Sequence, residues 1–108
     1  MNKFLISAAL LAFIIGAQAQ SQMPTNTVLE VLTFQDDTPV VLKGKIDRGL
    51  SGGKYQFSDS TGMIVLDIDD ELLANNQIMQ DQIIEVRGEV DKGWFSTEID
   101  VEEIMPSN

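Results

Sequence analysis

The sequence predicts an all-β domain in which five strands close into a small barrel, with two short helices. Apolar and polar residues alternate with a period of two in five segments between residues 40 and 101, as expected for half-buried strands. The segments follow one another as three and then two, with a short helical stretch between the third and the fourth. Two strands carry a glycine at matching positions, Gly44 and Gly88, where a coiled barrel bends sharply. This is the strand order of an OB-fold, a five-stranded Greek-key barrel; a small open β-sheet with two helices is the competing arrangement.

Residues 1–19 are predicted to be a cleaved, Sec-type signal peptide. Lys3 supplies a positive start, an apolar run covers residues 4–15, and Ala17 and Ala19 form an A-x-A cleavage site. The run is too short for a membrane span, which needs about 20 apolar residues; a buried core helix is the alternative interpretation. Because a secreted eukaryotic domain of this size usually needs disulfides, the pattern predicts the periplasm of a Gram-negative bacterium.

Residues 20–27 are predicted to form a flexible N-terminal segment, and residues 28–105 the OB-fold domain. A short helix is expected over residues 28–34, because Thr27 and Glu30 match a capping box. Several apolar residues of this helix are predicted to share one packed face: Val28, Leu29, Val31 and Leu32.

Each predicted strand is defined by the residues that alternate toward the barrel interior. In chain order these are Val40, Leu42, Gly44, Ile46, Tyr55, Phe57, Ile64, Leu66, Ile68, Ile84, Val86, Gly88, Val90, Phe95, Thr97, Ile99 and Val101. The turn before the third strand is expected to use Gly62 at a positive φ. A second short helix is predicted from Glu71 to about Ala74, where acidic residues suit the helix start. Ile104 breaks the alternation of the last strand, which predicts either a bulge or the end of the strand near Glu103.

Length and composition exclude most catalytic chemistry. A chain of 108 residues allows one small domain and leaves no room for a two-domain enzyme. The absence of Cys and His excludes disulfides, thiol nucleophiles, Ser-His-Asp triads and the usual zinc, haem and iron–sulfur ligands. The acidic run at residues 67–71 lacks the glycine and the distal Glu of an EF-hand loop. The sequence therefore predicts a protein that is not an enzyme and that has no cofactor and no dedicated metal site.

Charge argues against a nucleic-acid ligand, although many OB-folds bind one. All 17 acidic residues but only six of the seven basic ones lie beyond the predicted leader, so the formal charge there is about −11 and repels polyanions. A nucleic-acid site needs a basic groove and aromatic platforms. The outward positions of the second and third strands provide one cation and no aromatic side chain: Lys54, Gln56, Ser58, Val65, Asp67 and Asp69.

Four segments of the chain resemble a known family. They are DDTPVVLKGKI at residues 36–46, YQFSDSTG at 55–62, IVLDID at 64–69 and GEVDKGWFSTEIDV at 88–101. Their order and content are similar to those of the YgiW/YdeI family of periplasmic bacterial OB-fold (BOF) stress tolerance proteins. The resemblance implies a secreted OB barrel that helps cells survive envelope stress such as oxidants, metals, acid or cationic antimicrobial peptides. It implies no catalytic residues. Two features differ from the family pattern: a Gly-rich segment is absent before the domain, and Pro39 stands where members often have Trp.

Acidic residues on the outer faces of the third and fifth strands form the first candidate site. In the usual OB order these strands are neighbours, so Asp67 and Asp69 are expected to lie near Glu98 and Asp100. The hypothesis is that this face binds a cationic small molecule or peptide, or a basic surface of an envelope protein. The alternative is a solvated face that keeps a small secreted protein soluble.

The single tryptophan marks the second candidate site. Trp94 lies in the predicted turn between the fourth and fifth strands, a common binding edge in OB-folds. It is expected either to cap the barrel mouth, as aromatic residues mostly pack, or to stack on a ligand. The corresponding alternative function is an interaction module for an outer-membrane protein or a cell-wall glycan, through the loop edges around Ser51 and Trp94.

Overall fold

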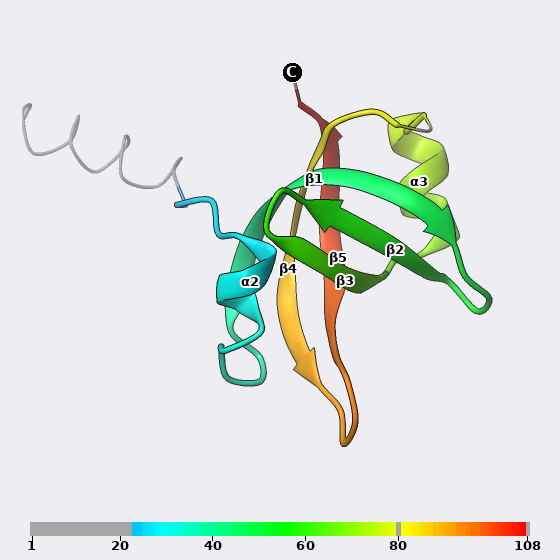
Figure 1. Cartoon of the computed structure of the whole chain (residues 1–108). Coiled ribbons are helices and arrows are strands. Elements are labelled where there is room, and N and C mark those ends of the chain that lie inside the picture. Colours follow the sequence, from blue (N-terminus) through cyan, green and yellow to red (C-terminus); the bar gives the residue numbers. More distant parts are fainter. Residues whose placement is uncertain (1–22, 80, 108) are drawn as a thin grey trace, which may run out of the picture.

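The computed structural model describes residues 23–79 and 81–107 (Figure 1). Its elements are α2 (Val28–Val31), β1 (Pro39–Gly49), β2 (Lys54–Asp59), β3 (Gly62–Asp67), α3 (Asp70–Asn76), β4 (Ile84–Lys92) and β5 (Thr97–Pro106). The strands close into a barrel in the order β1-β2-β3-β5-β4. All neighbouring strands are antiparallel except β3 and β5, which are parallel. The predicted OB-fold, with a short helix between β3 and β4, is therefore confirmed, whereas the predicted signal peptide lies outside the described residues.

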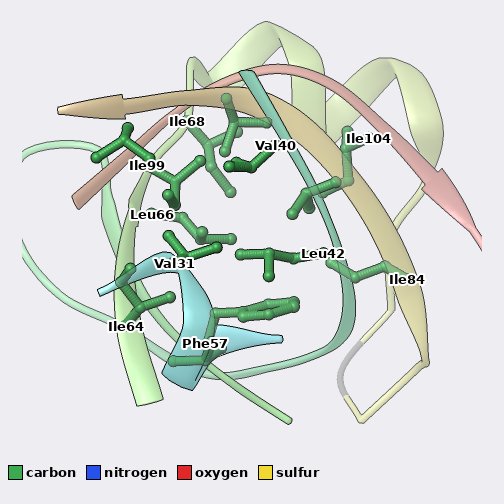
Figure 2. Close-up of a cluster of buried hydrophobic side chains, with 14 residues drawn as sticks. Val31, Val40, Leu42, Phe57, Ile64, Leu66, Ile68, Ile84, Ile99 and Ile104 are labelled. Carbon is green, nitrogen blue, oxygen red and sulfur yellow. The ribbon is translucent and has the colours of Figure 1, made fainter. Parts of the chain in front are cut away.

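The barrel interior is filled by the residues that alternate inward along the strands (Figure 2). The largest of them, Phe57, is fully buried, and each such side chain stabilises the fold by about 1.5–3 kcal/mol relative to its exposed state. The core cluster consists of Val28, Val31, Val40, Leu42, Phe57, Ile64, Leu66, Ile68, Ile84, Val86, Val90, Ile99, Val101 and Ile104. The period of two thus places the inward faces of all five strands around one continuous core.

Helix α2 is shorter than expected, and only half of its predicted apolar face is buried. Val28 and Val31 are fully buried, but Leu29 and Leu32 are 60% and 42% exposed. The helix ends after a single turn, so only residues three apart face the barrel. The predicted capping box at its start is confirmed, with the side chain and backbone of Thr27 both bonded to Glu30.

The tight turn between β2 and β3 is held by one carboxylate. Asp59 Oδ1 accepts hydrogen bonds from the Thr61 hydroxyl (2.6 Å), the Thr61 amide (2.7 Å) and the Gly62 amide (3.2 Å). Asp59 Oδ2 accepts one from the amide of Val28 at the start of α2 (2.9 Å). Burial alone would raise the pKa of Asp59, but these hydrogen bonds together hold it below its ordinary value. Asp59 therefore ties the turn to the helix.

Two glycines let neighbouring strands approach closely at the bends of the barrel. A Cβ atom on Gly44 would lie 2.2 Å from the Ser58 carbonyl oxygen, and one on Gly88 would lie 2.1 Å from the Asp100 carbonyl oxygen. The register between β4 and β5 shifts next to Gly88 and leaves Glu102 without a partner, which confirms the predicted bulge. The expectation of a positive φ at Gly62 is wrong, because the described glycines that adopt one belong to the β1–β2 loop.

The N-terminal segment runs beside β1, with Asn26 bridged to Leu42 in the parallel direction. The amide of Asn26 donates to the Val41 carbonyl (2.7 Å), and the amide of Val41 donates to Asn26 Oδ1 (3.2 Å). Val41 points away from the barrel interior, yet it is only 1% exposed.

Over residues 23–79 and 81–107, none of the helices is both long and apolar enough to span a membrane.

Candidate functional site

Strand pairing places acidic side chains in two rows on the outer wall of the barrel. One row runs from Asp67 on β3 through Asp100 on β5 to Glu89 on β4, and the other joins Glu98 to Asp91. These positions alternate with buried residues, so their side chains point outward. We call this surface the acidic face; it comprises five carboxylates and one ammonium group, namely Asp67, Glu89, Asp91, Glu98, Asp100 and Lys54.

Lys54, at the start of β2, lies at the edge of the acidic face and partly neutralises it. Its Nζ atom is 2.5 Å from Glu98 Oε1 and 3.5 Å from Asp67 Oδ2. The hydrogen bond to Glu98 is the main cause that raises the pKa of Lys54 above its ordinary value, against a smaller opposing effect of burial. Sequence reasoning placed Lys54 on the outer surface but missed these ion pairs, which the cross-strand pairing of Lys54 with Asp67 creates.

The carboxylates of the acidic face that have no cationic partner in the described residues lie on β4 and β5. Within the described part of the chain, ion pairs engage Asp67 and Glu98 but none engages Asp100, Glu89 or Asp91. The structure brings together three of the four predicted acidic residues. The fourth, Asp69, follows the end of β3 at the N-cap position of α3, where it is exposed and makes no side-chain capping bond.

Metal coordination receives no support from this arrangement. Among residues 23–79 and 81–107, no three acidic side chains gather closely enough to hold a metal ion. The carboxylates instead line an open, outward surface of the barrel, which suits recognition of an extended positive charge better than enclosure of a single ion.

Trp94 and Phe95 form an exposed aromatic pair at the tip of the β4–β5 hairpin. Their exposed fractions are 96% and 101%. The expectation that Trp94 caps the barrel mouth is wrong, as is the expectation that Phe95 is buried in the last strand. The physical reason is hairpin length: β4 continues to Lys92, β5 begins at Thr97, and the loop between them projects beyond the barrel (Figure 1).

The aromatic pair and the acidic face are continuous. Asp91 pairs with Glu98, and the next pair toward the tip, Lys92 with Thr97, directly precedes the loop that carries Trp94. At the opposite edge, Lys54 follows the β1–β2 loop. Strands β2 and β3 together with the β1–β2 and β4–β5 loops form the usual ligand-binding side of OB-folds. Here the β4–β5 loop of that side carries two exposed aromatic rings, and the carboxylates of the acidic face adjoin this loop along β4 and β5. Carboxylates and aromatic rings together can hold cationic groups and apolar side chains.

The closed β1-β2-β3-β5-β4 barrel defines an OB-fold protein, and its acidic face runs over β3, β5 and β4. The chain belongs to the bacterial OB fold (BOF) protein family, whose sequence profile matches residues 13–106. It is 42% identical over 78 residues to the calcium-regulated OB-fold protein CarO of Pseudomonas aeruginosa, covering 72% of this chain and 67% of CarO. It is 39% identical over 83 residues to protein YgiW of Escherichia coli K12, covering 77% of this chain and 64% of YgiW.

Solved structures support the same assignment. The structure of YgiW from E. coli superposes with a TM-score of 0.75 and 37% sequence identity, covering 79% of this chain and 91% of that one. The telomere capping protein Ten1 from Saccharomyces pombe superposes with a TM-score of 0.62 at 13% identity, covering 79% of this chain and 81% of Ten1. The second likeness shows the OB-fold alone. The resemblance to the YgiW family identified from the four sequence segments is confirmed.

Proposed function

We propose that this protein is a non-catalytic periplasmic binding protein that contributes to envelope stress tolerance by holding a cationic peptide, or a basic surface of a partner, on its acidic face. The observation that carries this proposal is the continuity between the carboxylates and the exposed aromatic pair. A basic amphipathic peptide presents both of the groups that such a surface would complement. The signal-like leader and the family resemblance support the periplasmic location and the role in stress tolerance.

Electrostatics favours a cationic ligand at this place. The whole chain carries a formal charge of −10, and Lys54 offsets only part of the acidic face. Side chains of Asp91 and Asp100 are exposed, so their attraction for a cation acts through water and weakens as salt shortens the Debye length, about 8 Å at physiological ionic strength. Trp94 and Phe95 would add apolar and cation–π contacts that salt does not screen in this way.

The test is a titration of the purified protein with a cationic amphipathic peptide, followed by two-dimensional amide NMR. Saturable shifts are expected at the acidic face and at the β4–β5 loop. A triple variant, Glu89→Gln, Asp91→Asn and Asp100→Asn, is expected to weaken binding at least about tenfold. The matched control removes the same number and types of charge elsewhere, at Glu71→Gln, Asp70→Asn and Asp81→Asn. Equal affinity of the two triple variants would refute the proposal.

The exposure of Trp94 favours a second candidate function, an interaction module for an outer-membrane protein or a cell-wall glycan. The Trp94 side chain is 96% exposed, so it contributes little to packing within the described residues. The β1–β2 loop, which includes Ser51, is a second exposed edge. Here Trp94→Ala is expected to abolish capture of the partner while leaving peptide binding to the acidic face measurable. Capture that survives both Trp94→Ala and Phe95→Ala would exclude this candidate.

A further inference from the structure

A pocket lies on a part of the barrel that the proposed function does not use. It has a volume of about 470 Å³, within the range of small-molecule sites. It forms where the N-terminal segment runs beside β1, near the turn between β2 and β3. Its lining comprises Thr25, Asn26, Thr27, Lys43, Gly44, Lys45, Ser58, Asp59, Ser60 and Ile83. None of these residues belongs to the acidic face or to the aromatic pair.

Two lysines in this pocket stand out among the cations of the protein. The other basic side chains of the described chain all donate to protein acceptors: Arg48 to Gln56, Lys54 to Glu98 and Asp67, Arg87 to Glu85, and Lys92 to the Leu32 carbonyl. Lys43 and Lys45 make no ion pair or side-chain hydrogen bond with any residue in the ranges 23–79 and 81–107. Both are exposed and lie two positions apart on the same side of β1.

Strand geometry brings the two ammonium groups to one opening. Residues two apart on a strand are separated by about 7 Å and point to the same side, so Lys43 and Lys45 repel each other unless an anion lies between them. Across the sheet, Lys43 faces Glu85 and Lys45 faces Ser58. Glu85 is bonded to Arg87 at 3.2 Å. Along β1, Asp47 lies two positions beyond Lys45 and accepts a hydrogen bond from the Ser58 hydroxyl (3.0 Å). Within the described residues, neither Glu85 nor Asp47 forms an ion pair with the two lysines.

The carboxylate in the pocket lining, Asp59, is also engaged by the fold. Its two oxygens accept four hydrogen bonds from Val28, Thr61 and Gly62, so it is not available to the lysines as a close partner. The same lining offers groups that can donate to an anion. These are the hydroxyls of Thr25 and Ser60 and the side-chain amide of Asn26, whose oxygen already accepts from Val41.

We propose that this pocket binds a small molecule carrying a single phosphate group, with Lys43 and Lys45 holding the phosphate. A phosphate monoester has a charge between about −1.5 and −2 at neutral pH, which two ammonium groups balance, and lysine is a frequent phosphate ligand acting as a point charge. The hydroxyl and amide groups of the lining would then bind the polar remainder of the molecule. The chain's net charge of −10 disfavours polyanions more strongly than a single phosphate group, because long-range repulsion grows with the charge of the ligand.

The test uses the purified protein and four probes in amide NMR titrations: inorganic phosphate, glucose 6-phosphate, glucose and citrate. Saturable shifts are expected for Asn26, Gly44 and Ser60 with both phosphate compounds, stronger with glucose 6-phosphate because it also fills the pocket. Glucose lacks the charge and should give none. Binding of citrate as tight as that of glucose 6-phosphate would replace the phosphate assignment by a general carboxylate site.

The variant pair Lys43→Gln with Lys45→Gln is expected to lower the affinity for glucose 6-phosphate at least about tenfold. Arg48→Gln with Lys92→Gln removes the same net charge outside the pocket and is expected to leave the affinity within about twofold. Circular dichroism checks that both double variants remain folded, which is expected because all four side chains are exposed. An equal loss in both variants would show a non-specific charge effect, and the absence of shifts in the parent protein would overturn the proposal.

Discussion

Replacement of Asp59 by Asn is the perturbation whose consequence the structure defines most closely. The carboxylate accepts four hydrogen bonds at 2.6–3.2 Å, which close the β2–β3 turn and satisfy the first amide of α2. An Asn side chain has one acceptor oxygen, and its NH₂ group faces amides that are themselves donors. At least one donor, at Val28 or in the turn, is then left without its partner.

The expected cost is about 2–3 kcal/mol. Hydrogen bonds to a charged acceptor contribute about 1.5–3 kcal/mol each, but the Thr61 donors are exposed and can turn to water. The amides of Val28 and Gly62 are partly buried and carry most of the loss. For a domain of this size, such a change lowers the midpoint of thermal unfolding by about 10–20 °C.

Urea denaturation followed by circular dichroism measures this difference in the free energy of unfolding. Tryptophan fluorescence is the wrong probe, because Trp94 is already 96% exposed in the folded state. The pKa of Asp59 is lowered by folding from its ordinary value of 3.8, so its charge contributes stability that is fully present above about that pH and is lost as the pH falls through the folded-state pKa. The difference in the free energy of unfolding between the parent protein and Asp59→Asn should therefore become smaller in strong acid. Two results would refute this explanation: a urea midpoint of Asp59→Asn equal to that of the parent protein at neutral pH, or a difference in the free energy of unfolding that stays the same in strong acid.

Four further substitutions distinguish buried, packed positions from exposed ones. Gly88→Ala is expected to lower the free energy of unfolding, measured with urea, by about 3 kcal/mol or more. The reason is that its Cβ atom would lie 2.1 Å from the backbone oxygen of Asp100. Gly49→Ala is the control and should cost far less, because its Cβ atom would meet only the ring edge of Tyr55 at 3.5 Å. Phe57→Ala is expected to destabilise the barrel by about 3–5 kcal/mol, since it empties a fully buried site; a thermal midpoint close to that of the parent protein would contradict the core assignment. Trp94→Ala should change the free energy of unfolding by less than about 0.5 kcal/mol, and a larger loss would mean that the ring packs in solution.

The barrel was predictable from sequence because strand alternation is a local signal with a global consequence. A period of two, repeated in five segments, leaves one apolar face per strand, and only closure around a common core buries them all. The same logic placed Gly44 and Gly88 at bends and the bulge beside Glu103. It failed for Leu29 and Leu32, since the length of α2 depends on where the chain must turn toward β1.

The candidate site was predictable in part. Parity along the strands placed Asp67, Glu98 and Asp100 on one outer surface, and the parallel pairing of β3 with β5 brought them together as expected. The ion pairs of Lys54 with Asp67 and Glu98 depend on the register between β2 and β3. Alternation of apolar and polar residues does not by itself specify which residues pair across two strands. The burial of Phe95 was wrongly predicted for a related reason: period two was extended into a loop that leaves the barrel.

The fold class, most of the core residues, the family and the negative charge of the outer surface follow from sequence alone, because residue patterns along the chain carry them. Only the tertiary structure decided which charges neutralise one another and which side chains share a pocket. Lys43 and Lys45 lie near Asn26 and Ser60 because the N-terminal segment runs beside β1, near a turn formed by later residues. Such contacts join segments far apart in the chain, and their geometry is set by register and closure of the barrel.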